Sequence, residues 1–529
     1  MAILKVVPRL LRGATPDKVD DESDGYIGVD VGIRKLGTRQ TLHQATTATK
    51  HTFIRMISDE AFKINVPSDE NILTRKMTSF VISAPGKVIA FGEHAVVYGK
   101  TAVAVSISLR SYLLVTSLLE SPRIVSIRFP DIGLSHTWNI DDLPWASFSP
   151  PGSKINKYLP VTSFDPALLT ALEPHLRDIS TQCPDGVRKI HRNSALAFLY
   201  LLLSLGSSNF QSCSYIIRST IPIGAGLGSS ASISVCIATA LLLQTRAITG
   251  PNKNQSSSEA RIQLDLINKW AFVGEICIHG NPSGVDNTVA SYGKAVIFQR
   301  SDQSKKPSIE SKWNFPELPL LLVDTREPKS TAVEVAKVAD LKRQYPELAE
   351  SIFSSIDTVS KHASNLLSAN SFDGKDLQSV SKLGKLIQVN HGLLVALGVS
   401  HPRLERIREI VDHEGIGWTK LTGAGGGGCA IVLLKPDLSP KKMELLDATL
   451  EGENFSRYKT VVGGKGVGVL WPALFENRKE VEREDLEIYE EKFLNAEKLK
   501  GVEKLVGVHG LGGTREAWKF WQLENVKSN

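Results

Sequence analysis

The segment Ile221–Ser232 reads IPIGAGLGSSAS and leads into an apolar run, SISVCIATALLL, that predicts a helix. Unpaired N–H groups and the positive end of the helix dipole converge at a helix N-terminus, so the segment predicts a phosphate-binding loop. The alternative is a Gly-rich turn that only precedes a buried helix. No Lys follows the last Gly, so this is not a Walker A loop, and a catalytic lysine must come from elsewhere.

Length, charge and cysteine content restrict the class of protein. A chain of 529 residues is too long for one ordinary core, which predicts two domains plus appendages. The net charge of +6 is small, and no Lys/Arg stripe alternates with aromatic residues, so nucleic-acid binding is not expected. The five cysteines are scattered and lack a CxxC pair, which predicts reduced thiols in the cytoplasm and no zinc site. No apolar run reaches the roughly 18 residues of a membrane span.

The composition changes along the chain and divides it into parts. The charged, Pro-containing segment Ser301–Lys312 predicts a domain boundary, and the Glu/Lys-rich segment Lys479–Leu505 predicts an amphipathic helix. Four parts are therefore expected: a poorly ordered N-terminal extension (1–78), an N-terminal domain (79–310), a C-terminal domain (311–478) and a charged helical tail (479–529).

Mixed strands and helices with hairpin-like spacing predict an α+β fold in two lobes. The segment from Ser79 to Gly99 predicts a strand, a tight turn at Pro85 and Gly86, and a short second strand. The segment Leu134–Pro160 is rich in Pro, Ser and Trp and predicts a surface excursion. Other expected elements are a strand at Cys213–Ser219 and helices at Arg192–Leu205, Ala260–Ile278, Thr331–Ala369 (with one Pro interruption) and Val380–Leu397.

Two further motifs carry chemistry. In SAPGKVIAFGEHAVVYG, Ser83–Gly99, the Pro-Gly pair presents Lys87. A lysine at this position could neutralise a phosphate or lower the pKa of a neighbouring hydroxyl. The alternative is a solvated surface lysine. In EICIHGNPSGVDN, Glu275 and His279 share one helix face. Glu275 with a Ser hydroxyl is a ligand set that Mg²⁺ prefers, and Asp286 is the candidate to deprotonate an acceptor alcohol. His279 alone is better interpreted as a structural cap. This inventory suits phosphoryl transfer.

These motifs together resemble the three signatures of the GHMP kinase superfamily. They are PIGAGLGSSA, the upstream APGK and GEH, and the downstream TGAGGGGC, Thr422–Cys429. GEHAVVYGK and HGNPSGVDN narrow the resemblance to the mevalonate kinases. It implies a two-lobed α+β fold, with an S5-like N-terminal lobe and a ferredoxin-like C-terminal lobe, and ATP-dependent phosphorylation of the C5 hydroxyl of (R)-mevalonate. The glycine run either touches nucleotide or lets a backbone approach the phosphate loop, and the second role is expected to dominate.

The resemblance also implies roles for individual residues. Asp286 is the expected catalytic base and Lys87 its partner. Ser230 and Glu275 are expected to ligate Mg²⁺. The mevalonate side is expected to include Lys87, Glu93, His94, Asp286 and, on a weaker match in DTREPKST, Thr331. The ATP phosphates are expected at Ile223, Gly224, Ala225, Gly226, Leu227, Gly228, Ser229 and Ser230.

Alternatives remain open at this point. Another GHMP small-molecule kinase, such as a phosphomevalonate kinase or a galactokinase, shares these motifs. A non-catalytic metabolite sensor of the same fold is the rival from a different class, although such proteins usually lose the Lys or the Asp. The resemblance further suggests a homodimer, which no residue pattern supports.

Overall fold

The computed structural model describes residues 79–118, 122–148, 165–299, 308–473, 487–510 and 514–523. All of them belong to one compact unit, Arg75–Asn529. The expected N-terminal extension, residues 1–78, lies outside the described residues.

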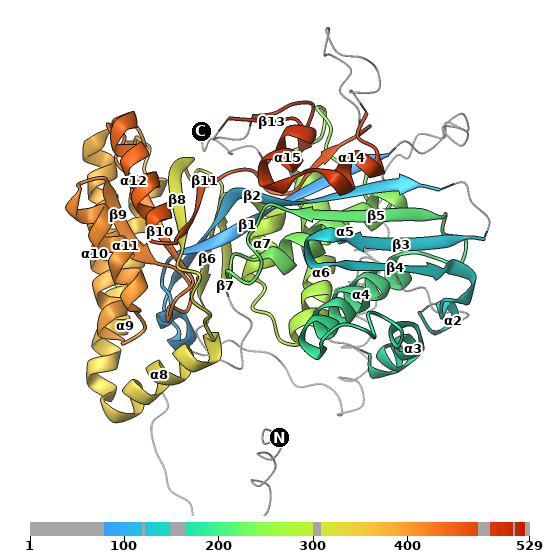
Figure 1. Cartoon of the computed structure of the whole chain (residues 1–529), viewed down its shortest axis with the longest axis horizontal. Helices are drawn as coiled ribbons and strands as arrows, with labels where there is room; N and C mark the ends of the chain where they lie inside the picture. The colour runs from blue at the N-terminus through green and yellow to red at the C-terminus, as the bar shows by residue number, and fades with distance from the viewer. Residues whose placement is uncertain are drawn as a thin grey trace, which may run out of the picture. The chain divides into compact units, whose positions relative to one another are not determined.

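A large sheet, mainly antiparallel, forms the N-terminal lobe (Figure 1). Its long strand β2 pairs with β1 along most of its length, with β6 at one end and with β5 at the other. The strands are β1 (Phe80–Phe91), β2 (Ala102–Ser117), β3 (Ile124–Phe129), β4 (Leu134–Asn139), β5 (Cys213–Ser219), β6 (Ala295–Gln299), β7 (Ser308–Lys312), β12 (Gly468–Leu470) and β15 (Lys519–Phe520).

Both faces of this sheet are buried, which explains why its central strands are apolar without clear alternation. Along β2, Leu113 and Val115 pack into one core cluster, and the alternate residues Tyr112 and Leu114 pack into another. The first face is covered by helices that carry the functional motifs (Figure 1). The helices of this lobe are α2 (Trp145–Phe148), α3 (Pro166–Leu176), α4 (Asp185–Leu205), α5 (Ser229–Gln244), α6 (Ser257–His279) and α7 (Val285–Tyr292), with 3-10 turns η2 (Ala95–Tyr98), η3 (Pro130–Ile132) and η4 (Ile140–Asp142).

The C-terminal lobe contains four antiparallel strands in the order β11-β8-β10-β9, the order of a ferredoxin-like sheet. β11 joins it to β2 of the first sheet, through the ladder pair Val462–Ile107 and through hydrogen bonds of Ser108 with Thr460 and Val461. The expected Pro interruption is confirmed, because α8 ends before Pro346 and α9 begins there. The elements are β8 (Leu318–Asp324), β9 (Gly417–Leu421), β10 (Cys429–Leu434), β11 (Ser456–Val462), α8 (Thr331–Gln344), α9 (Pro346–Ser368), α10 (Leu377–Ala396), α11 (Pro402–His413) and α12 (Pro440–Gly452).

One expectation about a surface segment is wrong in the part of the chain that is described. Residues 134–148 are not a surface excursion, because Trp138, Trp145 and Phe148 are buried in the core of the lobe. The part of the expected domain boundary that is described, Ser308–Lys312, forms β7 and pairs with β6. Likewise, β12 lies within the expected C-terminal range but pairs with β1 of the N-terminal lobe. Charge and Pro content alone did not reveal these pairings.

The tail covers the second face of the N-terminal sheet. Its described part forms two short helices in place of the single expected helix, α14 (Glu490–Asn495) and α15 (Lys498–Leu505), followed by β13 (Val508–His509), β14 (Thr514–Arg515) and β15. β15 pairs with the short strand β12, and Phe493 and Val506 are fully buried against Leu114 and its neighbours. The tail therefore completes the core of this lobe.

Removing one methylene group from this tail core should destabilise the protein. Ile488 is 1% exposed, so Ile488→Val should lower the free energy of unfolding by about 0.5–1.5 kcal/mol. Ile262→Val is the matched control, because Ile262 is 53% exposed on α6. Urea denaturation measures both variants, and equal midpoints would mean that the tail contributes no packing.

All five cysteines are free thiols, as expected, and four of them are buried. Among the described helices, none has an apolar stretch long enough to cross a bilayer.

Candidate active site

Lys87 and Asp286 meet beside the Gly-rich loop. Lys87 lies on β1 and Asp286 is the second residue of α7, and Lys87 Nζ lies 3.3 Å from Asp286 Oδ1. The positive end of the α7 dipole favours the negative charge of Asp286. A Cβ atom on Gly228 would lie 2.9 Å from Lys87 Cγ, and φ at Gly228 is +73°, so glycine is needed for the loop to approach the pair this closely.

A β-bulge, and not the expected tight turn, presents Lys87. β1 continues through Pro85 with a register shift before Lys87, where it pairs with β2. Pro85 has no N–H group for the ladder, which favours an irregularity at this point. The Lys87 N–H group donates to the Leu227 carbonyl at 2.8 Å. The bulge therefore ties β1 directly to the predicted phosphate loop.

The predicted loop lies where the sequence places it, between β5 and α5. α5 begins at Ser229, and its N-cap is Gly228 in the left-handed conformation. Ile223 is 56% exposed, and a Cβ atom on Gly224 would meet no other atom within 4 Å. The loop is thus open to solvent at Ile223 and Gly224, and the first-turn N–H groups of an α-helix such as α5 have no partner within the helix.

Glu275 is a buried carboxylate near the end of α6 that faces the first turns of α5. Ser230 Oγ donates to Glu275 Oε2 at 3.3 Å, and Ser234 Oγ donates to Glu275 Oε1 at 3.4 Å. Burial, and next the charge of Asp286, raises the pKa of Glu275 to about 8. Because both effects penalise the ionised carboxylate, this arrangement would be stabilised by a bound cation.

His279, one turn along α6 from Glu275, is more exposed. Its side chain is 53% exposed, and Nε2 lies 3.0 Å from Ser230 Oγ. His279 is the last residue of the helix, followed by Gly280. His279 therefore lies beside Ser230, and its role as a structural cap stays a prediction.

Glu93 and His94 lie in a strained turn that the C-terminal lobe holds in place. His94 has φ +59° and ψ −48°, and the Ala95 N–H group donates to the Glu93 carbonyl at 2.6 Å, which makes a γ-turn. His94 Nε2 lies 2.8 Å from the Ala424 carbonyl in the glycine run. The backbone strain is therefore balanced by contacts from a segment more than 300 residues away.

The Glu93 carboxylate is buried and fully engaged. Glu93 Oε1 forms an ion pair with Lys420 Nζ of β9, and Asn390 Nδ2 donates to Glu93 Oε2 at 3.2 Å. Lys420 is 0% exposed, and burial lowers the pKa of its ammonium group. Sequence reasoning assigned Glu93 to substrate but did not find this partner.

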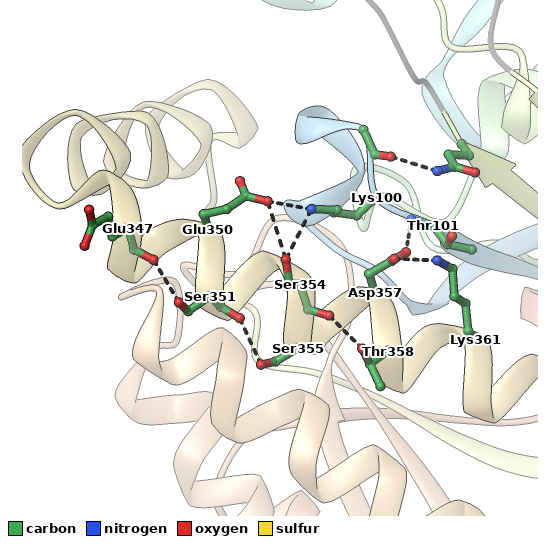
Figure 2. A network of polar contacts seen from close by, with 12 residues as sticks. Lys100, Thr101, Glu347, Glu350, Ser351, Ser354, Ser355, Asp357, Thr358 and Lys361 are labelled. Atoms are coloured by element: carbon green, nitrogen blue, oxygen red, sulfur yellow. Dashed lines mark hydrogen bonds and ion pairs between the residues drawn. The ribbon is translucent and has the colours of Figure 1, made fainter.

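The other end of the same loop docks on α9 (Figure 2). Lys100 Nζ donates to Glu350 Oε1 at 2.6 Å, and the Thr101 N–H group donates to Asp357 Oδ1 at 2.8 Å. Tyr98 stacks on Phe353 with the ring centroids 4.3 Å apart. Both ends of the Glu93–Thr101 segment are thus fixed by the C-terminal lobe.

Comparison with known proteins identifies the family. The family described as GHMP kinases N terminal domain matches residues 193–294, and GHMP kinases C terminal matches residues 374–444. A mevalonate kinase of Gibberella zeae is 60% identical over 459 residues, which cover 86% of this chain and 90% of the relative. The chain belongs to the mevalonate kinase family.

Other relatives agree with this assignment. A mevalonate kinase of Aspergillus fumigatus is 56% identical over 460 residues, covering 86% of this chain and 85% of the relative. The crystal structure of the Methanococcus jannaschii mevalonate kinase is 26% identical, with a TM-score of 0.51, and the match covers 72% of this chain and 97% of that one. The expected two-lobed GHMP fold is confirmed.

Lys329 is a candidate that sequence reasoning missed. It lies in the same DTREPKST segment as Thr331, and its Nζ donates to the Ala225 carbonyl at 3.3 Å. A Cβ atom on Gly428 would lie 2.4 Å from the same Nζ, so Lys329 bridges the phosphate loop and the glycine run. At Gly428 the glycine run therefore lies against the side chain of Lys329, and the expected approach to the backbone of the phosphate loop is not seen there.

Thr331 is exposed at the start of α8. Within the described ranges, no hydrogen bond or ion pair joins Thr331 to the other candidate residues. Of these two residues of DTREPKST, it is Lys329 that lies against the phosphate loop.

Proposed function

We propose that this chain transfers the γ-phosphoryl group of ATP to the C5 hydroxyl of (R)-mevalonate, giving 5-phosphomevalonate for isoprenoid and sterol biosynthesis. The observation that carries the proposal is the 3.3 Å contact between Lys87 and Asp286 beside Gly228 of the phosphate loop. The family supports mevalonate as the acceptor over phosphomevalonate or galactose. The presence of Lys87, Glu275 and Asp286 argues against a non-catalytic sensor.

Phosphoryl transfer requires positioning and charge neutralisation more than covalent chemistry by the protein. In this proposal Ile223–Ser230 binds the ATP phosphates through backbone N–H groups and the α5 dipole. Asp286 accepts the proton of the acceptor hydroxyl. Lys87 lies within reach of the same oxygen and lowers the pKa of the hydroxyl by its charge.

The donor set at Glu275 fits a magnesium ion. A buried carboxylate whose pKa is raised, next to the Ser230 hydroxyl, supplies the hard oxygen ligands that Mg²⁺ prefers. Bound Mg²⁺ would neutralise negative charge on the nucleotide phosphates. We assign Ser230 and Glu275 as its protein ligands.

Removing the charge of Glu275 should weaken the use of Mg²⁺. For Glu275→Gln we expect the Mg²⁺ concentration that gives half-maximal activity to rise about tenfold or more, because a neutral amide is a much weaker ligand for a hard cation. Glu259→Gln on the same helix is the control. Steady-state rates over a Mg²⁺ titration measure both, and a wild-type dependence for Glu275→Gln would refute the assignment.

Lys329 should contribute to phosphate binding. A half-buried ammonium group against the phosphate loop stabilises anionic phosphates, so Lys329→Gln should raise the KM for ATP about tenfold. Lys385→Gln, at an exposed position of α10, is the control. An unchanged KM for ATP would assign Lys329 to structure alone.

In this proposal His94 lies near mevalonate, and Glu93 acts indirectly, by holding His94 in place. Both Glu93 oxygens are engaged by Lys420 and Asn390, so Glu93 positions the γ-turn that carries His94. Thr331 remains a weaker candidate for this side. A homodimer and a cytoplasmic location also remain predictions.

A coupled ADP-release assay tests the proposed function. The assay uses Mg²⁺·ATP with mevalonate, phosphomevalonate, galactose or homoserine as the acceptor. Turnover with mevalonate alone is expected. Turnover with another acceptor, or with none while ATP still binds, would overturn the proposal.

A further inference from the structure

A cavity of about 450 Å³ is lined by β2, by β11 and by the part of the tail that includes β15. Ile107 and Val461 contribute apolar side chains from the two lobes, and Trp518 and Phe520 contribute an aromatic wall from the tail. The cavity does not include the Lys87–Asp286 pair or the phosphate loop. It falls within the size range of pockets that bind small molecules.

The charged residues that line this cavity are mostly cationic. Arg110, Lys465 and Arg515 face a single carboxylate, Glu317. Glu317 Oε1 already lies 3.5 Å from Lys294 Nζ, outside this trio. The lining therefore carries excess positive charge.

Arg110 is a buried cation whose hydrogen-bond partners are all neutral. Its Nη1 donates to the Lys465 carbonyl at 2.9 Å, and its Nη2 donates to the Ser83 carbonyl at 3.0 Å. Burial, and next the charge of Arg515, lowers the pKa of Arg110 to about 9. Arg515 lines the same cavity, so an anion bound there would reduce the repulsion between the two guanidinium groups.

The other two cations also lack a carboxylate at bonding distance. Arg515 Nη1 donates to the Tyr112 hydroxyl at 2.8 Å, and Nη2 donates to the Ser108 carbonyl at 3.3 Å. Lys465 Nζ lies 5.0 Å from the centre of the Phe520 ring, and no ion pair to a described residue involves it. The Lys465 side chain is exposed, so it stands at the mouth of the cavity.

We propose that this cavity is a second ligand site, which binds an organic phosphate. The phosphate lies against Lys465 and Arg515, and the apolar or aromatic body of the ligand lies against Trp518 and Phe520. Arginine and lysine bind phosphate by charge-assisted hydrogen bonds, and the aromatic wall favours an organic ligand over the inorganic ion. The site is separate from the proposed reaction and needs the tail for its formation.

Phenyl phosphate is a suitable probe, because it combines both groups. Isothermal titration uses the full chain with saturating mevalonate and AMP-PNP, a non-hydrolysable ATP analogue, so that the active site is filled. We expect one saturable site that binds phenyl phosphate more tightly than inorganic phosphate. Lys465→Gln should weaken binding about tenfold, since it removes one charge-assisted contact. Lys442→Gln on α12 is the control and should bind as wild type does.

Three results would overturn the proposal. They are the absence of saturable binding, wild-type affinity in Lys465→Gln, and binding that occurs only when AMP-PNP is left out, which would assign the probe to the phosphate loop. Lys465→Gln carries little risk to folding because the side chain is exposed and unpaired among the described residues. Arg515→Gln provides a second test, with its melting temperature recorded, and should lose binding to a similar or greater extent.

Discussion

Asp286→Asn should lower kcat by about two orders of magnitude or more while ATP still binds, since general-base contributions are around 10²–10⁴. An aliphatic hydroxyl, like bulk water, is a far weaker acid than a carboxylic acid, so complete proton transfer before phosphoryl transfer would be steeply unfavourable. In a loose transition state the nucleophile carries little charge early, and Asp286 needs to take the proton only late. Asparagine keeps the shape of the side chain but removes the proton acceptor.

Pre-steady-state and steady-state kinetics with mevalonate measure the change in kcat, and nucleotide titration measures the affinity for ATP. Asp373→Asn is the control, because Asp373 is an exposed residue of the C-terminal lobe. Undiminished turnover in Asp286→Asn would refute the assignment of the base. A parallel loss of ATP affinity would instead mean that Asp286 acts mainly by holding Lys87, its partner at 3.3 Å.

The sequence predicted the local features of this site well because each depends on neighbouring residues. α5 begins at Ser229 because the glycine and serine residues there favour a helix start. α6 ends before Gly280 because glycine favours a helix end. The bulge at Pro85 was mistaken for a turn, because Pro-Gly favours both and only the partner strand decides between them.

Long-range partners could not be predicted in this way. Lys420 lies in a short strand, GWTKL, whose sequence gives no sign that the lysine is fully buried. Its partner Glu93 is 327 residues away, so the pair exists only after both lobes have formed. The tail shows the same limit, because its sequence predicted one amphipathic helix, while it forms two short helices, and Phe493 and Val506 complete a core that begins with β1 and β2.

Breaking the Glu93–Lys420 pair should produce the largest loss of stability. Lys420→Met removes the cation and leaves a buried carboxylate without its counter-charge, which typically costs about 3–5 kcal/mol in the free energy of unfolding. The double variant Glu93→Gln/Lys420→Met should recover part of this loss, because no buried charge then remains. Urea denaturation of the wild type, both single variants and the double variant completes the cycle.

Lys361→Met provides the comparison with an exposed pair. Lys361 Nζ lies 2.7 Å from Asp357 Oδ2, but the lysine side chain is 57% exposed, so its loss should change stability by less than about 1 kcal/mol. In the double variant we also expect a raised KM for mevalonate and an unchanged KM for ATP, since the γ-turn at His94 loses its anchor on β9 while the phosphate loop is untouched. Equal stability losses for Lys420→Met and Lys361→Met would contradict the large loss expected from breaking the buried pair. A double variant with wild-type KM for mevalonate would show that Glu93 supports only the fold, and would leave the Ala424 contact to hold His94.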